Sequence, residues 1–249
     1  MRRGVTIGFL SLLLTSGQAS ESTREISTEE LERILVEKTA TVLDARPSLE
    51  YAISHIPGAV NVAPKPGVPI SMYVSDVAEI GRLVRGNKAA PLVLYCNGLH
   101  CGKSKRLAAE LLDAGYTDVR RYQAGMPGWR AAGRVCEIEL EGLRHVLAND
   151  GTAVVIDARE AAEFLTGSLR GARNIPRSQV LAGKDAGEVK RAKDDGRLPM
   201  EDHNTRLLVV ATDAAAARHV AEALAREAFH NVSYFPGPFA AVHNTQEKR

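Results

Sequence analysis

Short apolar runs alternate with helical patterns along the chain. Residues 41–43, 91–95 and 119–122 are brief, mostly apolar runs of the length expected for buried strands. A helical pattern over residues 27–35 begins with serine, a typical N-cap, and has glutamate three positions later, as in a capping box. A longer pattern, rich in alanine and leucine, predicts a helix over residues 104–114. Short strands that alternate with helices predict a parallel sheet covered on both faces.

The whole pattern is repeated once at a fixed offset. VLDAR at residues 42–46 returns as VIDAR at 155–159. One offset held across a long stretch indicates two copies of one unit. The second copy predicts strands at residues 153–156, 207–210 and 232–235 and a helix over residues 214–228. We therefore expect an α/β fold of two tandem domains, residues 24–136 and 137–245, each a mainly parallel sheet with helices on both faces.

Composition and charge narrow the class of protein. Of the 249 residues, 45% are hydrophobic and 25% are charged, which is typical of globular proteins and excludes disordered, collagen-like and coiled-coil chains. A net charge of +2 provides no basic surface for nucleic acid or an anionic membrane. Three cysteines are too few for a disulfide scaffold, and their odd number leaves at least one unpaired within the chain.

The first residues have the features of a cleavable signal peptide. Arg2 and Arg3 precede a mostly apolar run over residues 5–14, and Gly17 and Ala19 provide small residues for a signal peptidase. The apolar run is too short to span a bilayer, which takes about 20 apolar residues. We therefore expect residues 1–20 to be a signal peptide and the mature protein to be periplasmic or secreted, where its cysteines meet an oxidising environment.

Cys96 is the strongest candidate for chemistry because it directly follows the strand predicted at 91–95. Ligands of open α/β sheets bind beyond the carboxyl ends of strands. A loop that leads into a helix N-terminus directs backbone N–H groups toward an anion and favours the thiolate form of a cysteine. Gly98 and Gly102 let this loop curl. A buried structural cysteine is the alternative for Cys96, and Cys136, which lacks this context, is interpreted as structural.

The loop after Cys96 is thus predicted to cradle an anionic substrate above a nucleophile. Lys103 adds a positive charge at the end of the loop. The predicted substrate-binding residues of this loop are Asn97, Gly98, Leu99, His100, Cys101, Gly102, Lys103 and Ser104.

Five motifs of the first unit together resemble the rhodanese family of sulfurtransferases, specifically its tandem-domain members. They are VLDAR at residues 42–46, EY at 50–51, HIPGA at 55–59, YC at 95–96 and GMPGW at 125–129. The second unit keeps the framework, so the resemblance covers nearly all of the chain after the signal peptide. The resemblance implies two tandem rhodanese-like domains, of which residues 24–136 form the catalytic one and residues 137–245 one without the catalytic cysteine.

The resemblance also implies a mechanism. The Cys96 thiolate would take a sulfane sulfur from a small donor such as thiosulfate, become a persulfide and pass that sulfur to cyanide, a thiol or a protein acceptor. No metal or organic cofactor, nucleic acid or membrane is implied. Arg46 recurs in the second unit as Arg159, which favours a framework role, although it could also reach the substrate. His55 is replaced by Ser168 in the second unit and is interpreted as a turn residue.

The loop departs from the family pattern in two respects. Six residues separate Cys96 from Lys103, where the usual rhodanese loop has four, so the cradle is wider and thiosulfate as the preferred donor is in doubt. Related phosphatases and arsenate reductases have five residues before an arginine; here that position is Gly102, and Lys103 cannot form the bidentate fork. The loop also contains Cys101, which could form a disulfide with Cys96, exchange a persulfide with it, or simply fill space.

Two other classes of function therefore stay open beside sulfur transfer. One is a thiol-disulfide redox protein that uses Cys96 and Cys101. The other is a rhodanese-fold binding module without turnover. The second unit is expected to be silent, because it contains no cysteine after Cys136 and because Asp213 would repel an anion at the corresponding loop.

Overall fold

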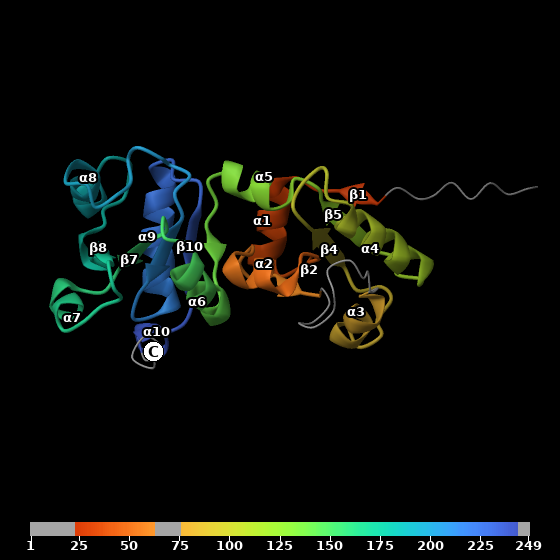
Figure 1. Ribbon diagram of the computed structural model, residues 1–249. Helices are drawn as coiled ribbons and strands as arrows, with labels where there is room; N and C mark the ends of the chain where they lie inside the picture. Colours follow the sequence, from red (N-terminus) through yellow and green to blue (C-terminus); the bar gives the residue numbers. More distant parts are fainter. Residues whose placement is uncertain (1–22, 63–75, 244–249) are drawn as a thin grey trace, which may run out of the picture.

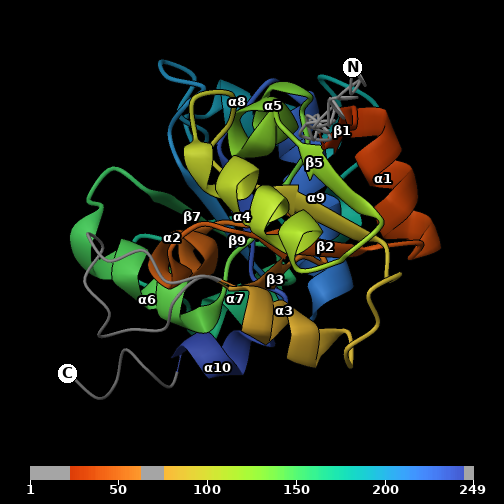
Figure 2. The same cartoon turned by 90° about the vertical axis from the view of Figure 1, so that its right-hand side faces the viewer.

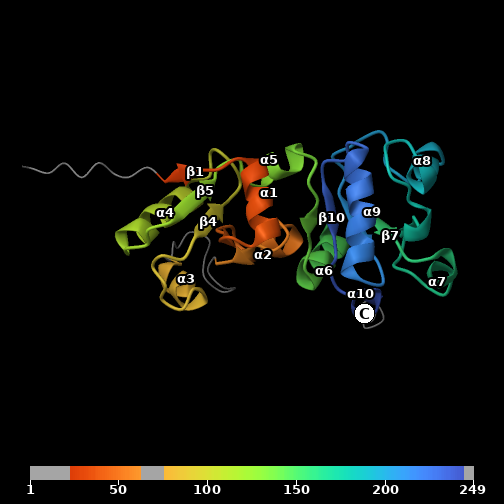
Figure 3. The ribbon, with the colours of Figure 1, turned by 180° about the vertical axis from the view of Figure 1, so that it is seen from behind.

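The computed structural model describes residues 23–62 and 76–243 as two α/β domains joined end to end. Figures 1 and 3 show the domains side by side with α2 (Ser48–Ile53) and α6 (Leu140–Asn149) at the junction. Figure 2 looks along the long axis, so the first domain lies in front of the second. The two halves of the described chain thus correspond to the two copies of the sequence repeat.

The first domain is built on a five-stranded parallel sheet in the order β1-β5-β4-β2-β3. Its strands are β1 (Arg24–Glu25), β2 (Thr41–Asp44), β3 (Val60–Asn61), β4 (Leu92–Tyr95) and β5 (Val119–Tyr122). Its other helices are α1 (Thr28–Glu37), α3 (Val77–Leu83), α4 (Gly102–Asp113) and α5 (Gly125–Ala131). The three predicted strands of this unit are therefore confirmed, and two short strands extend the sheet at its edges.

The second sheet repeats the first, in the order β6-β10-β9-β7-β8 and with every pairing parallel. Its strands are β6 (Cys136–Glu137), β7 (Val154–Asp157), β8 (Arg173–Asn174), β9 (Leu207–Val210) and β10 (Val232–Tyr234). Its other helices are α7 (Ala161–Leu165), α8 (Gly187–Asp194), α9 (Ala214–Arg226) and α10 (Phe239–His243), with a 3-10 turn at Arg177–Gln179. The expected fold class, two tandem α/β domains with mainly parallel sheets, is confirmed.

Alternation along β4 explains why the first sheet is covered on both faces. Val93 and Tyr95 pack with α1 and α5 in one hydrophobic cluster, whereas Leu92 and Leu94 pack with α3 and α4 in another. All four side chains are fully buried, as expected for a central strand of a parallel sheet. The N-cap of α1 is as predicted, since the Ser27 hydroxyl accepts a hydrogen bond from the Glu30 N–H at 3.2 Å. The reciprocal half of the predicted capping box is replaced by an ion pair of the Glu30 carboxylate with Arg24.

The junction between the domains is made of strand and helix contacts. His55 and Glu137 exchange two antiparallel backbone hydrogen bonds, both 2.9 Å long. The backbone of Cys136 pairs with β10 of the second sheet, while its side chain is buried in the α1 and α5 cluster of the first domain. Gly142 on α6 lies against the Ala52 carbonyl oxygen of α2, where a side chain would collide with it. The short strand β6 therefore contributes its backbone to the second sheet and its Cys136 side chain to the core of the first domain.

Candidate active site

Cys96 lies immediately after β4, at the carboxyl edge of the first sheet. Its side chain is 2% exposed, and the following loop turns back through a hydrogen bond from the Cys101 N–H to the Gly98 carbonyl, 3.0 Å long. The helix α4 begins at Gly102, two positions before the predicted start at Ser104, because Cys101 in extended conformation acts as its N-cap. The helical pattern did not indicate this start, because Gly102 has a low helix propensity and Lys103 adds no apolar position.

Cys96 and Cys101 form a disulfide within this loop. Their Cα atoms are 6.3 Å apart, inside the usual range of about 4.4–6.8 Å for bonded cysteines. The two sulfurs are unequal in access, because Cys96 is buried and Cys101 is half-buried. Of the alternatives that the sequence left open for this pair, the disulfide is the one present, and in this state neither sulfur is a free thiolate.

The residues predicted to form the cradle, 97–104, lie in the loop closed by this disulfide and in the first turn of α4. Their side chains differ in exposure, since Leu99 is 67% exposed and Ser104 is 2% exposed. The exposed residues are Asn97, Leu99, His100, Gly102 and Lys103, while Gly98 is buried. No side chain of the described residues caps the first-turn amides of α4. Those amides and Lys103 thus form the electropositive side of the loop.

The short helix α5 supports the loop from beneath. Its Met126 N–H donates to the Cys96 carbonyl oxygen at 3.1 Å. Gly125 adopts a φ of +57° and packs directly against the Cys96 and Gly98 backbone, so a Cβ at Gly125 would collide with both. Gly98 itself has a φ of +94°. The GMPGW motif at residues 125–129 therefore fixes the position of Cys96, a role that the motif alone did not reveal.

One carboxylate contacts the loop from the other side. Asn97 donates from Nδ2 to Glu50 Oε2 at 2.7 Å, which ties the loop to α2. The negative charge of Glu50 thus lies one residue away from the nucleophile, where it opposes the approach of an anion. The sequence singled out Glu50 only as part of the EY motif at residues 50–51.

Arg46 is bound within the framework. Its guanidinium forms a bidentate pair with Asp44, with Nε 3.0 Å from Oδ1 and Nη2 2.5 Å from Oδ2, and Nη2 also donates to the Ser54 carbonyl at 2.6 Å. The side chain is buried, and Arg159 repeats the pair with Asp157. Among the described hydrogen bonds none joins Arg46 to the Cys96 loop. The structure thus gives Arg46 the framework role, and substrate binding by it stays a prediction without a contact to support it.

The second domain keeps the geometry of this site but not its chemistry. The Phe239 N–H donates to the Ala211 carbonyl at 2.9 Å, as that of Met126 does to Cys96. The N-cap of α9 is Asp213, whose carboxylate accepts from the Ala216 N–H at 2.9 Å. The protein's own carboxylate thus occupies the helix terminus that is left uncapped in the first domain.

His55 has a role that the sequence did not predict. It is 4% exposed and stacks on Tyr51. Its Nδ1 donates to the Tyr51 carbonyl oxygen at 2.9 Å, and its Nε2 lies 3.4 Å from Glu137 Oε2. Tyr234 donates to the other Glu137 oxygen at 2.6 Å. Burial raises the pKa of Glu137, but the hydrogen bonds from His55 and Tyr234 outweigh burial and hold that pKa below its usual value. The interpretation of His55 as a turn residue did not foresee its contact with Glu137 at the junction between the domains. The replacement of His55 by Ser168 in the second unit was the sequence feature that could have indicated a role specific to the first unit.

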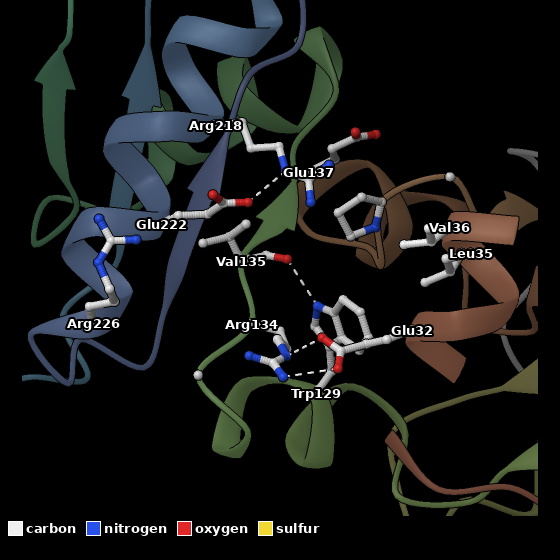
Figure 4. A pocket seen from close by; sticks show the side chains of 13 residues that line it. Glu32, Leu35, Val36, Trp129, Arg134, Val135, Glu137, Arg218, Glu222 and Arg226 are labelled. Atoms are coloured by element: carbon white, nitrogen blue, oxygen red, sulfur yellow. Dashed lines mark hydrogen bonds and ion pairs between the residues drawn. The ribbon is translucent and has the colours of Figure 1, made fainter. Parts of the chain in front are cut away.

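A separate cleft of about 590 Å³ lies between the domains (Figure 4). Its walls carry one ion pair from each side, Arg134 with Glu32 and Arg218 with Glu222. Trp129 also lines the cleft and donates from Nε1 to the Val135 carbonyl at 2.9 Å. The described lining of this cleft includes none of the residues 96–104, so the cleft is distinct from the Cys96 loop.

Within residues 23–62 and 76–243, no group of three or more His, Cys, Asp or Glu side chains is arranged to hold a metal ion. No helix in these ranges is long and apolar enough to cross a bilayer. The predicted signal peptide, residues 1–20, lies outside the described residues.

Comparison with known proteins matches both halves of the chain to one family. A model of the rhodanese-like domain matches residues 27–132 and again residues 143–245. Among curated proteins, the chain is similar to an HTH-type transcriptional regulator of Mycobacterium tuberculosis, with 36% identity over 93 residues. That match covers 37% of this chain and 35% of the regulator, so the chain spans about a third of the regulator's length.

Several solved structures are also similar. A thiosulfate sulfurtransferase from Pseudomonas aeruginosa is 19% identical with a TM-score of 0.39, covering 90% of this chain and 42% of that one. A 3-mercaptopyruvate sulfotransferase from Escherichia coli is 20% identical with a TM-score of 0.38, covering 87% and 98%. EanB in complex with hercynine is 16% identical with a TM-score of 0.38, covering 91% of this chain and 61% of that chain. The twofold match of the domain model is the finding that bears on what the chain is.

Proposed function

The chain belongs to the family of rhodanese-like domain proteins, and from that premise we propose that it is a sulfurtransferase that carries sulfane sulfur as a persulfide on Cys96. The observation that carries the proposal is the contrast between the two loops. In the first, a cysteine lies beneath an uncapped helix terminus; in the second, Asp213 caps that terminus and no cysteine is present. Only the first loop therefore offers both a nucleophile and unused amides for an anion.

The chemistry proceeds in two half-reactions. With the loop reduced, the Cys96 thiolate attacks the outer sulfur of thiosulfate, the S–S bond of the donor breaks, and sulfite leaves with the electron pair. An acceptor such as cyanide then attacks the outer sulfur of the persulfide, thiocyanate departs, and the Cys96 thiolate is restored. The amides of the first turn of α4 stabilise the negative charge on the donor and on sulfur throughout.

The charges around the loop act in opposite directions on an anionic donor. Lys103 and the amides of α4 attract the anion, while Glu50 beside Asn97 repels it. The two opposing charges limit affinity for any strongly charged donor. Thiosulfate is therefore the probe we choose. The physiological donor is the anion or persulfide that binds best between the attraction of Lys103 and the α4 amides and the repulsion of Glu50.

The test is trapping of the persulfide. The Cys101→Ser variant is reduced, freed of reductant and incubated with thiosulfate, and its intact mass is measured. We expect a gain of one sulfur atom, no gain in the Cys96→Ser/Cys101→Ser variant, and an unchanged gain when Cys136→Ala is added as a matched cysteine control. A Cys101→Ser protein that folds but gains no sulfur would contradict the proposal, as would a gain that survives loss of Cys96.

A second candidate function is thiol-disulfide exchange, which the Cys96–Cys101 disulfide itself favours. A redox protein of this kind exchanges electrons with dithiols at equal rates with and without a sulfur donor. Mass analysis separates the two functions, because only sulfur transfer adds mass to the Cys101→Ser variant.

A binding module is the third candidate, and the similarity of 93 residues to a transcriptional regulator is its support. In this function the first domain recognises a partner without turnover. Repeated turnover of thiosulfate and cyanide, measured as sulfite release, would exclude a binding module. A Cys96→Ser variant that matches the wild type in every assay would favour a binding module.

We also propose that the protein is exported to the periplasm or secreted. Support comes from Arg2, Arg3 and the apolar run that follows. N-terminal sequencing of protein recovered from a bacterial periplasm should begin near Ser20, and a protein that retains Met1 in the cytosol would contradict export.

A further inference from the structure

The second cysteine of the loop is positioned to do chemistry of its own. The disulfide places the Cys101 sulfur in bonding contact with Cys96 Sγ, at a Cα separation of 6.3 Å that is ordinary for a disulfide. The hydrogen bonds from Met126 to Cys96 and from Cys101 to Gly98 hold both ends of the loop in this conformation. The same approach is therefore available when Cys96 carries an extra sulfur.

The position of Cys101 favours an anionic sulfur. Cys101 is the N-cap of α4, a helix of 12 residues, and no described side chain accepts from its first-turn amides. The second domain shows that this position does hold a negative charge, because Asp213 at the N-cap of α9 accepts from the Ala216 N–H at 2.9 Å. A thiolate at Cys101 would find the same amides unoccupied.

From these observations we propose that Cys101 is a catalytic residue that resolves the Cys96 persulfide and releases its outer sulfur as hydrosulfide. This inference rests on the proposed function. The outer sulfur of the Cys96 persulfide first takes a proton from solvent. The Cys101 thiolate then attacks the inner sulfur, Cys96 Sγ, the bond between Cys96 Sγ and the outer sulfur breaks, and hydrosulfide leaves with the electron pair. The sulfane sulfur is reduced, the two cysteines are oxidised, and the product on the protein is the Cys96–Cys101 disulfide seen in the structure.

The cycle then requires a dithiol reductant, and the exposure of the two sulfurs determines where it attacks. Cys96 is 2% exposed, whereas Cys101 is half-buried between exposed loop residues. Attack on the accessible Cys101 sulfur expels the Cys96 thiolate, which is the nucleophile for the next donor, and leaves a mixed disulfide on Cys101. The second thiol of the reductant then attacks its own sulfur in that mixed disulfide, forms the disulfide of the reductant and releases the Cys101 thiolate. Each turnover thus uses one donor and one dithiol and yields one hydrosulfide. The next reaction in the sequence must therefore take hydrosulfide as its substrate rather than a protein-bound persulfide.

A single-turnover experiment tests this role. Wild-type protein is fully reduced, freed of reductant without oxygen, and mixed with excess thiosulfate in the absence of any acceptor. We expect one equivalent each of sulfite and hydrosulfide, loss of two free thiols, and a final mass equal to that of the disulfide form. The Cys101→Ser variant should release one equivalent of sulfite, keep the added sulfur and release no hydrosulfide. The Cys136→Ala control should behave as wild type.

The outcomes separate this inference from the proposed function. If wild-type protein keeps a persulfide and both thiols survive, Cys101 does not resolve it, although Cys96 still transfers sulfur. If hydrosulfide is released equally by the Cys101→Ser variant, the resolving role is likewise wrong. If neither protein releases sulfite, the proposed function itself fails.

Discussion

Gly125 lies directly against the Cys96 carbonyl group, so close that no other residue fits between α5 and the loop. The adjacent Met126 N–H bonds to that same carbonyl oxygen. The nucleophile is therefore positioned by a backbone contact across the carboxyl edge of the sheet, and not only by the strand that precedes it.

Gly125→Ala is expected to displace the loop. The new Cβ meets the Cys96 carbonyl carbon and oxygen at a residue with φ of +57°, so both strain and overlap destabilise the fold, by about 2–4 kcal/mol in total. Sulfur loading from thiosulfate should fall at least tenfold, measured by intact mass on samples that circular dichroism shows to be folded. Gly133→Ala is the matched control, because Gly133 has φ of +71° with nothing within 4 Å, so it should cost only about 1 kcal/mol and leave loading unchanged. Equal loading by both variants would refute the positioning role of Gly125.

Glu50→Gln is expected to improve the binding of an anionic donor. Glutamine keeps an acceptor for Asn97 but removes the negative charge beside the loop, which is worth about 0.5–1 kcal/mol in a partly exposed site. The KM for thiosulfate should fall about two- to fivefold at low ionic strength, with little change in kcat and a smaller effect in high salt. Glu37→Gln, an exposed change of equal charge at the end of α1, should have no effect. A KM that rises in Glu50→Gln would contradict the electrostatic argument.

Asp213→Ala should destabilise the protein without affecting sulfur transfer. Loss of the N-cap of α9 removes the bond to the Ala216 N–H and costs about 0.5–2 kcal/mol of unfolding free energy. Persulfide formation should be unchanged, because the second domain has no cysteine in its loop. Urea unfolding and mass analysis check both results, with the exposed Glu201→Ala as the control for a surface change. A large loss of loading in a folded Asp213→Ala protein would mean that the second domain takes part.

Acid should weaken the junction through Glu137. The hydrogen bonds from His55 and Tyr234 hold the pKa of Glu137 below the ordinary 4.5, so its ionised form stabilises the folded state. This contribution is complete above about pH 4.5 and is lost as the pH falls through the lowered pKa. Glu137→Gln should therefore cost about 1–2 kcal/mol near neutrality, and this cost should shrink as the pH falls through the lowered pKa of Glu137. Urea unfolding at several pH values measures this, with exposed Glu141→Gln as the control. A constant difference between Glu137→Gln and wild type at all pH values would contradict it.

The sequence predicts the central strands and long helices well, because their signals are local. The runs at 91–95 and 207–210 are apolar on both faces, and the structure buries Leu92–Tyr95 and Leu207–Val210 completely. The edge strands β1 and β6 were not predicted, because two residues carry no periodicity and their pairing depends on distant partners.

The candidate site was predictable in its composition but not in its state. Spacing placed Cys96 and Cys101 in one loop, yet whether two cysteines bond depends on the separation of their Cα atoms, which sequence does not fix. The contacts of Glu50 with Asn97 and of Gly125 with Cys96 join segments far apart in the chain. Such contacts leave no periodic signal, so they became visible only in three dimensions.

The segment that links the domains is itself a part of both, since Cys136 gives its backbone to the second sheet and its side chain to the first core. Hinges in proteins are loop residues that can change φ and ψ freely, and this segment has no such freedom. Bending at the junction would break strand pairing on one side and open a cavity on the other. Both domains therefore share packing through Cys136, and independent motion of one domain relative to the other is opposed by the strand pairing of one and the side-chain packing of the other.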